Sequence, residues 1–196
     1  MADGMPEGAA KAAAEPAPAA TADAEPAAEA SVDYRRVAPI FAARCVKCHT
    51  DGGLMGDAPE GFRLTSYDEA LASGDRARVV PGSPSASELL RRVRGQSLPR
   101  MPFDGPPFLS EEEIALVEEW IARGAPDSEG RAAPVPAGAK VRLHGTLASG
   151  AMLDDLPLVM TTSTRIDKSP GPGDYVQVRG RVTPEGTIRV ERLRPR

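Results

Sequence analysis

Two cysteines and one histidine lie close together in the sequence, and their side chains are suited to holding a redox-active group. They are Cys45, Cys48 and His49, in the segment CVKCH. Cys-x-x-Cys-His is the pattern of covalent haem attachment. Two thiols on one turn can reach the two vinyl groups of one porphyrin, and the adjacent histidine then points towards the iron. The segment predicts one covalent haem c, bound through Cys45 and Cys48, with His49 as an iron ligand.

The residues alone leave three other interpretations of this segment open. A structural zinc site needs four ligands, and the only other histidine, His144, lies far along the chain. A thioredoxin-like redox pair expects a strand–helix–strand context, whereas helix and loop patterns surround CVKCH. The third alternative is a chance match in a chain that has only two cysteines and two histidines.

A second axial ligand for the iron has two rival candidates, both methionines. Met101 lies between two prolines, in a loop between two predicted helices. A rigid loop can present a sulfur at low entropic cost. Met55 is closer in sequence to the cysteines. A methionine ligand raises the reduction potential relative to a second histidine. Met152 and Met160 are expected to fill the core of the β region instead.

Helical periodicity surrounds the CVKCH segment. Apolar residues recur at helical intervals before it, over residues 34–44, and predict a helix that ends at the cysteines. Residues 67–72 are compatible with a second, short helix. Ser85 with Glu88 is spaced as a capping box for a third, which Gly95 is expected to end.

A last helix is predicted after a proline-rich stretch. Ser110 with Glu113 is spaced as its capping box, and Gly124 is its expected stop. Beyond residue 138 the periodicity changes to alternation. Short β-like runs follow, separated by Gly, Pro and Asp: VRLHGTL, LPLVMTT, TRID, DYVQVRGRV and GTIRVERL. Such a set of short strands predicts a small barrel or sandwich.

The domain organisation follows from these changes in pattern. Residues 1–30 consist mainly of Ala, Pro and Glu and cannot bury enough apolar surface to order the chain, so they predict a disordered tether. Residues 31–125 form the predicted haem domain, residues 126–138 a linker, and residues 139–196 a small β domain.

Composition limits the partners and the compartment. The chain has 196 residues and a formal net charge of −4, which argues against a nucleic-acid partner and leaves room for a partner with a basic face. No apolar run reaches the roughly 20 residues that cross a membrane, and no signal-peptide pattern is visible. Because haem is normally attached to such motifs outside the cytoplasm, we expect an exported, periplasmic or cell-envelope protein. Its precursor is then expected to begin before Met1, with a leader or a membrane anchor.

Four blocks of the sequence together resemble the planctomycete-type cytochrome c domain, a monohaem class I-like family. The resemblance runs from about Tyr34 to Ala125, over YRRVAPIFAARCVKCH, GFRLTSYDEAL, VVPGSPSASELLRRV and MPFDGPPFLSEEEIALVEEWIARGA. It implies an all-α, haem-wrapping fold whose first and last helices pack together. It also maps the methionine of the family's Met-Pro motif onto Met101. Phe103 departs from the family, which often has a second proline there.

Arg63 lies in the second of these blocks, and its charge suits a haem propionate. The alternative is a solvated surface arginine. The C-terminal region more weakly resembles small β-barrels of exported bacterial proteins, which are similar in shape to the oligonucleotide/oligosaccharide-binding fold. That fold does not assign a function, and Tyr175 is the region's only aromatic residue. His144 is expected to be a packed or surface residue.

These inferences predict a monohaem c-type cytochrome and not an enzyme. Its iron would cycle between Fe(II) and Fe(III) while held by His49 and Met101, and the β module would dock it to a redox partner. The alternatives are a fixed haem subunit of a larger membrane electron-transfer complex, and a ligand-binding haem sensor or small peroxidase. We expect no nucleic-acid partner, and a membrane tether is conceivable only through a segment before residue 1.

Overall fold

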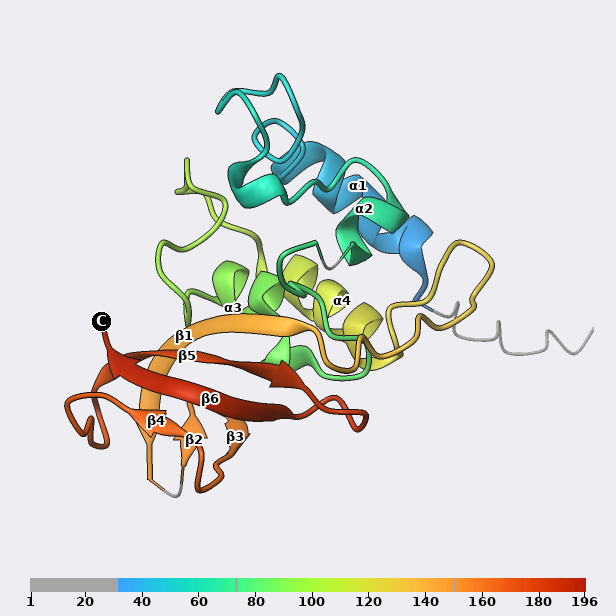
Figure 1. Cartoon of the computed structure of the whole chain (residues 1–196). Helices are drawn as coiled ribbons and strands as arrows, with labels where there is room; N and C mark the ends of the chain where they lie inside the picture. Colours follow the sequence, from blue (N-terminus) through green and yellow to red (C-terminus); the bar gives the residue numbers. More distant parts are fainter. Residues whose placement is uncertain (1–31, 73, 150) are drawn as a thin grey trace, which may run out of the picture. The chain divides into compact units, whose positions relative to one another are not determined.

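The helical and alternating patterns fold into a helical part followed by a β-barrel (Figure 1). The computed structural model describes residues 32–72, 74–149 and 151–196. The predicted tether, residues 1–30, lies outside them. Four α-helices occur in the helical part: α1 (Tyr34–Arg44), α2 (Tyr67–Leu71), α3 (Glu88–Arg94) and α4 (Glu111–Ala122). Two short 3-10 helices, Pro59–Gly61 and Pro84–Ala86, lie between them.

The helix ends agree with the sequence signals except at α3. The capping box of Ser110 and Glu113 is present at the start of α4. Gly95 ends α3 in the left-handed conformation at φ 81°. The prediction that Ser85 caps α3 was wrong, because Ser85 belongs to the 3-10 turn that Pro84 begins. Ser87 occupies the cap position, and its hydroxyl accepts a hydrogen bond from Val80 N at 2.8 Å rather than from the helix.

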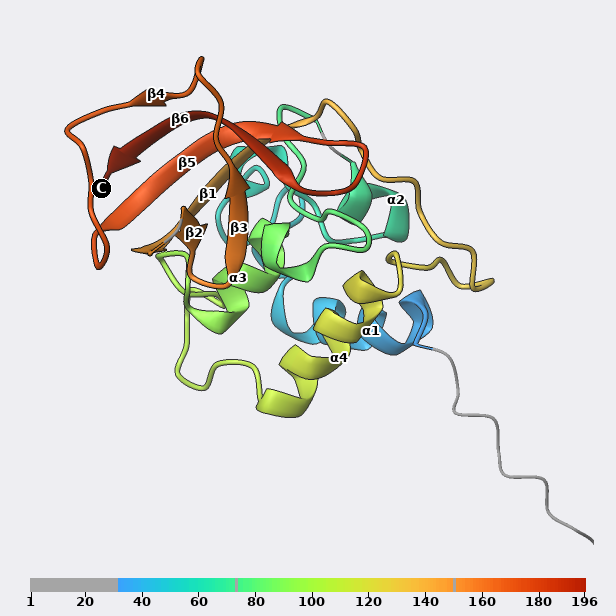
Figure 2. The ribbon, with the colours of Figure 1, turned by 90° about the horizontal axis from the view of Figure 1, so that it is seen from below.

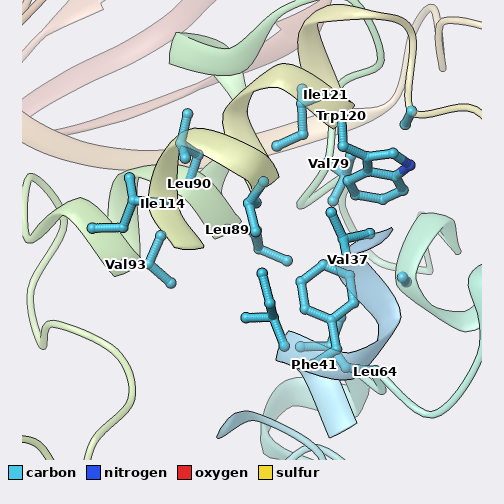
Figure 3. Packing of buried hydrophobic residues seen from close by; sticks show 14 of the residues in the cluster. Val37, Phe41, Leu64, Val79, Leu89, Leu90, Val93, Ile114, Trp120 and Ile121 are labelled. Atoms are coloured by element: carbon cyan, nitrogen blue, oxygen red, sulfur yellow. The ribbon is translucent and has the colours of Figure 1, made fainter. Parts of the chain in front are cut away.

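The core of the helical part is built where α1 packs against α4 (Figure 3). The ring of Phe41 meets that of Trp120 edge-on, with centroids 5.8 Å apart. Trp120 is fully buried, and its indole N–H donates to the carbonyl of Pro126 at 2.9 Å. Val37 on α1 and Ile121 on α4 are also fully buried. This packing fixes the orientation of α1 and therefore the position of the two cysteines that follow it.

All five predicted β runs form strands, and one further short strand, β2, was not predicted. The strands are β1 (Lys140–Ala148), β2 (Met152–Leu153), β3 (Leu156–Val159), β4 (Arg165–Ile166), β5 (Tyr175–Val182) and β6 (Ile188–Pro195). They pair in the order β3-β2-β1-β5-β6, and β3 also pairs in parallel with β6, through Leu158 and Ile188. Five strands therefore close into a barrel, with β4 attached outside the ring to β6. The predicted small barrel is confirmed.

The barrel lies against α3, as Figure 2 shows, and both belong to one compact unit. Arg91 on α3 is fully buried there. Its Nη2 donates to the carbonyl of His144 on β1 at 3.0 Å and pairs with Asp154. The predicted domain boundaries at residues 125 and 138 stay predictions. No helix in the described residues is both long and apolar enough to cross a membrane.

Candidate haem site

The end of α1 holds the two cysteines and the histidine on one turn. Cys45 N donates to Phe41 O at 2.9 Å, which continues the helix, and His49 N donates to Cys45 O at 2.9 Å, which closes the next turn. Neither Cys45 nor Cys48 is in a disulfide. The local hydrogen bonds therefore bring all three side chains to the same region, as the spacing of CVKCH predicts.

The His49 ring is held in the state that a metal ligand requires. Its Nδ1 lies 2.8 Å from the carbonyl oxygen of Phe62. Because a carbonyl oxygen only accepts, Nδ1 carries the ring proton and the lone pair of Nε2 is free to bind a metal. Burial lowers the pKa of His49, which keeps the ring neutral. Leu64 N donates to His49 O at 2.9 Å, which holds the loop that contains Phe62 against the CVKCH turn.

A cavity of about 300 Å³ opens beside this turn. That volume is at the lower end of the range for ligand and cofactor pockets, about 300–1,000 Å³. Its walls come from the CVKCH turn, from the loop before α2, from α3 and from the proline-rich loop after α3. The apolar and sulfur-bearing side chains that line it include Cys45, Cys48, Met55, Phe62, Leu64, Leu89, Val93 and Met101.

Both candidate methionines line the cavity, but they are held differently. Met101 is half-buried, and its backbone N donates to Arg92 O at 3.0 Å, which folds the loop back onto α3. Met55 is 60% exposed in the glycine-rich loop. Met152 lies in β2 and Met160 packs against the barrel core, away from the cavity. The structure thus brings Met101 and His49 to one cavity, while Met101 as a ligand stays a prediction.

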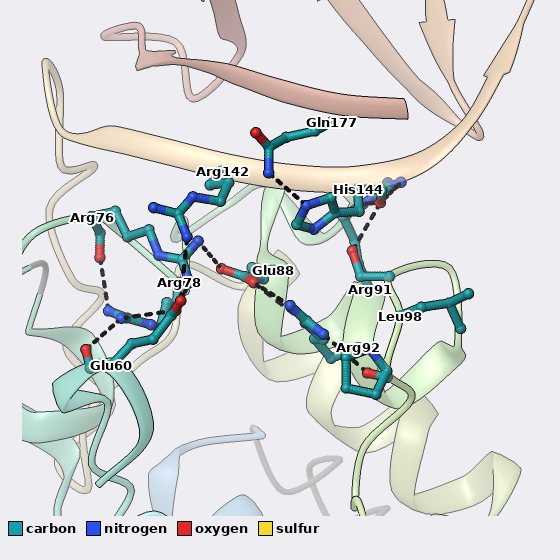
Figure 4. A network of polar contacts seen from close by, with 12 residues as sticks. Glu60, Arg76, Arg78, Glu88, Arg91, Arg92, Leu98, Arg142, His144 and Gln177 are labelled. Atoms are coloured by element: carbon teal, nitrogen blue, oxygen red, sulfur yellow. Dashed lines mark hydrogen bonds and ion pairs between the residues drawn. The ribbon is translucent and has the colours of Figure 1, made fainter. Parts of the chain in front are cut away.

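Arg63 does not line the cavity. Its guanidinium pairs with Asp51 at 2.7 Å in an exposed position, so its role as a propionate partner stays a prediction. Arg76 and Arg78 line the cavity instead, with side chains only 8% and 7% exposed (Figure 4). Sequence reasoning missed them. The available signal was an Arg-x-Arg pair directly before an apolar run.

The buried arginines beside the cavity are ion-paired, Arg76 with Glu60 and Glu88 and Arg78 with Glu60, but their hydrogen bonding is incomplete. Arg76 Nη1 lies 3.3 Å from Glu88 Oε2, yet neither atom has a hydrogen-bond partner. Burial lowers the pKa of Arg76 to about 10, so the guanidinium remains charged at neutral pH. A buried cation that borders an apolar cavity is stabilised by an anion. Haem is an apolar ring with two carboxylates, so apolar walls, a free imidazole nitrogen, two thiols and buried arginines fit it together.

A zinc or thiolate site fits less well. Burial raises the pKa of the Cys45 thiol to about 12, whereas zinc and redox chemistry use the thiolate. No group of three or more His, Cys, Asp and Glu side chains that could hold a metal ion occurs in residues 32–72, 74–149 and 151–196. His144, the other histidine, is buried beside Gln177 on the barrel and does not line the cavity.

Comparison with known proteins gives one match. Residues 45–105 match the family model described as Planctomycete cytochrome C. The matched segment includes Cys45, Cys48, His49 and Met101, and it confirms the resemblance inferred from the sequence blocks. A cytochrome c family segment implies haem c and indicates haem-based electron transfer. No curated protein and no solved structure matches the chain.

Proposed function

We propose, from the cytochrome match over residues 45–105, that this protein is a monohaem c-type cytochrome that carries electrons and has no catalytic reaction of its own. Cys45 and Cys48 would hold the haem by thioethers, and His49 and Met101 would ligate its iron. The observation that carries the proposal is the His49 ring. Its Nδ1–H donates a hydrogen bond to Phe62 O at 2.8 Å, and its Nε2 is free beside two thiols and Met101.

When bound, the haem supplies an iron that cycles between Fe(II) and Fe(III). The residues of the chain would control that cycle. The Phe62 carbonyl orients the imidazole of His49 and raises its basicity. Leu64, Leu89 and Val93 exclude water from the cavity. Arg76 and Arg78 would hold the propionates, and their positive charge favours the reduced iron.

The barrel and the location extend this proposal. We propose that the barrel docks the haem domain to a redox partner protein or to a membrane electron-transfer complex. We also propose that the protein is exported to the periplasm or cell envelope, since covalent haem attachment takes place there. The proposal is supported by the contacts of Arg91, which hold the barrel to α3, a wall of the cavity.

The test is a redox-poised absorption spectrum of the full chain, expressed with an export signal and a haem-attachment system. We expect ferrous c-type bands and a haem that organic acid does not extract, because the thioethers are covalent. Met101→Ala should remove the near-infrared band of methionine bound to ferric iron. Met55→Ala is the matched control in the same cavity, and the band should survive in it. Exported protein without c-type bands would refute the proposal.

A further inference from the structure

The outer face of three barrel strands carries a concentration of positive charge. Apolar residues of β1, β5 and β6 point into the barrel core, and the residues between them point outward. The outward cations, which we call the basic face, are Lys140, Arg142, Arg179, Arg181, Arg189, Arg192, Arg194 and Arg196. The whole chain carries −4, so this surface is a local reversal of its charge.

Like charges lie directly opposite one another on this face. Arg179 on β5 is the register partner of Arg142 on β1 and of Arg192 on β6. Like charges opposite one another destabilise an antiparallel pair. The pKa of Arg179 is lowered, first by partial desolvation and then by the charges of neighbouring arginines that include Arg142, Arg194 and Arg192. The fold therefore retains a repulsion that an anion would relieve.

Acidic side chains neutralise only part of the face. Arg142 pairs with Glu60 at 3.2 Å and Arg181 with Glu191 at 2.8 Å, and Arg192 pairs with Asp167. Within the part of the chain that the structure describes, the other five cations have no acidic partner within 4.0 Å: Lys140, Arg179, Arg189, Arg194 and Arg196.

Two of these unpaired arginines are already oriented. Arg179 Nε and Arg194 Nε donate to the same oxygen, Gln177 Oε1, at 3.1 and 3.0 Å. Gln177 is itself buried and donates through its amide nitrogen to His144 Nε2 at 2.8 Å (Figure 4). The two guanidinium groups are thus anchored at Nε, which leaves their terminal nitrogens to bind. A guanidinium fork matches the geometry of a carboxylate, and an oriented fork loses less entropy on binding.

The chemistry of the face favours a protein over a membrane or a single-stranded nucleic acid. Tyr175 is the only aromatic residue of the barrel, and its hydroxyl accepts from Leu98 N at 2.7 Å. Base stacking needs exposed aromatic rings, and insertion into a bilayer needs exposed large apolar side chains. Among the residues that the structure describes, the exposed large apolar ones all lie off these three strands: Leu54, Met55, Leu98, Phe103, Val159 and Ile166.

We propose that the basic face docks the acidic surface of a partner protein, with Arg179 and Arg194 binding carboxylates at its centre. The inference rests on the electron-transfer function proposed above, because a carrier must dock to exchange electrons. It names the chemistry of the partner that the barrel would meet.

The test uses the full, haem-loaded chain and immobilised poly-L-glutamate as the probe, at low and at physiological ionic strength. The double variant Arg179→Glu/Arg194→Glu removes the oriented pair. The control Arg36→Glu/Arg123→Glu makes the same change in net charge at two exposed cations of the helical part, of which Arg123 forms an exposed ion pair with Glu119. We expect the first variant to lose about tenfold in affinity at low salt, and the control to lose much less.

Four outcomes decide the inference. Equal losses in both variants would mean that net charge alone drives binding, and would overturn it. Unchanged binding by Arg179→Glu/Arg194→Glu would also overturn it, even if the haem spectrum and reduction potential are those of a c-type cytochrome. Face-dependent binding to anionic phospholipid vesicles or single-stranded DNA that persists at salt where poly-L-glutamate dissociates would overturn the protein assignment. Face-dependent binding of poly-L-glutamate by a chain without c-type haem would support the docking surface while refuting the proposed function.

Discussion

Replacing Arg91 by methionine tests how strongly the barrel is held to the helical part. The Arg91 side chain is 0% exposed and is the only charged side chain of α3 with no exposure. Its Nε and Nη2 donate to His144 O at 3.3 and 3.0 Å, and its Nη1 donates to Ser85 O at 3.2 Å. Arg91 also pairs with Asp154, whose side chain is 21% exposed. Methionine replaces the apolar stem of arginine but has none of these donors.

The expected loss follows from these contacts. Breaking a buried ion pair by removing one partner costs about 3–5 kcal/mol. The lower end applies here, because water reaches Asp154 and Thr146 N still donates to its carboxylate. His144 O also keeps the hydroxyl of Ser97, at 2.8 Å. We expect Arg91→Met to lower the free energy of unfolding by about 3 kcal/mol.

The assay is chemical denaturation of the full chain, with a matched control in the same helix. Arg94→Met removes an ion pair to Glu118 whose partners are 26% and 38% exposed, so it should cost less than about 1 kcal/mol. Because α3 lines the cavity and the next loop carries Met101, the near-infrared methionine band should also weaken at lower denaturant in Arg91→Met. Equal losses in the two variants would refute the reasoning that burial makes Arg91 the anchor.

Three further predictions concern neighbouring sites. Gly145→Ala should destabilise the fold by about 1–3 kcal/mol in thermal melts, because the added Cβ would overlap the side chains of Asp154 and Arg91. The control Gly171→Ala should leave the stability unchanged, because its added Cβ meets no atom within 4 Å. Arg76→Met should lower the reduction potential of the haem-loaded protein by roughly 50 mV, since it leaves Glu60 and Glu88 with one buried cation fewer beside the haem site. Arg63→Met should shift the potential much less, because Arg63 lies outside the cavity in an exposed ion pair with Asp51. Burial and the charges of nearby arginines lower the pKa of His144 in the folded chain to about 4, below its usual value of about 6.5. Between these two pH values the unfolded chain therefore binds a proton at His144 that the folded chain does not. The stabilisation by neutral His144 is therefore complete above that pH window and is lost as the pH falls through it. We expect it to be about 2 kcal/mol after allowance for partial solvation. In urea denaturation, His144→Gln should make the free energy of unfolding depend less on pH between these values.

Local signals in the sequence were sufficient for the four helices, for every strand except the short β2 and for one half of the site. CVKCH lies on a single turn, and its hydrogen bonds join residues a few positions apart, such as Cys45 and His49. The end of α3 at Gly95 was also predictable, because the left-handed conformation there depends only on that residue having no side chain. The Ser85 cap failed for an equally local reason, since Pro84 starts a tighter turn that uses the position.

Long-range pairings could not be read from the sequence. Arg76 and Arg78 reach the cavity only because the chain before α3 folds beside the CVKCH turn. In the sequence, Arg91 resembles its partly buried neighbours Arg92 and Arg94 in the run Arg-Arg-Val-Arg. Only the packing of the barrel, through the carbonyl of His144, makes one of the three a buried anchor. Helical periodicity predicts which face is apolar, but it does not predict which charged residue a second domain will cover.

The basic face was hidden by the averaging of charge along the chain. An overall −4 argued against a nucleic-acid partner and left room for a partner with a basic face, yet strand register places arginines of three strands in adjacent rows. Register depends on where pairing starts and on irregularities such as the shift between Arg179 and Gly180. A slip of one residue would turn the row inward. The register of one sheet can therefore create a charged docking surface that the net charge of the whole chain does not indicate.

His144 connects the two proposals made for the barrel. Its backbone carbonyl accepts from Arg91 on α3, and its ring accepts from Gln177, which orients Arg179 and Arg194. A surface that is joined to the cavity wall by such short contacts cannot turn freely relative to that wall. Electron transfer depends on a reproducible separation between cofactor and partner. If the partner docks on the basic face, the buried Arg91 anchor is what would keep that separation constant, and a loosened anchor should slow transfer even where binding to the face is unchanged.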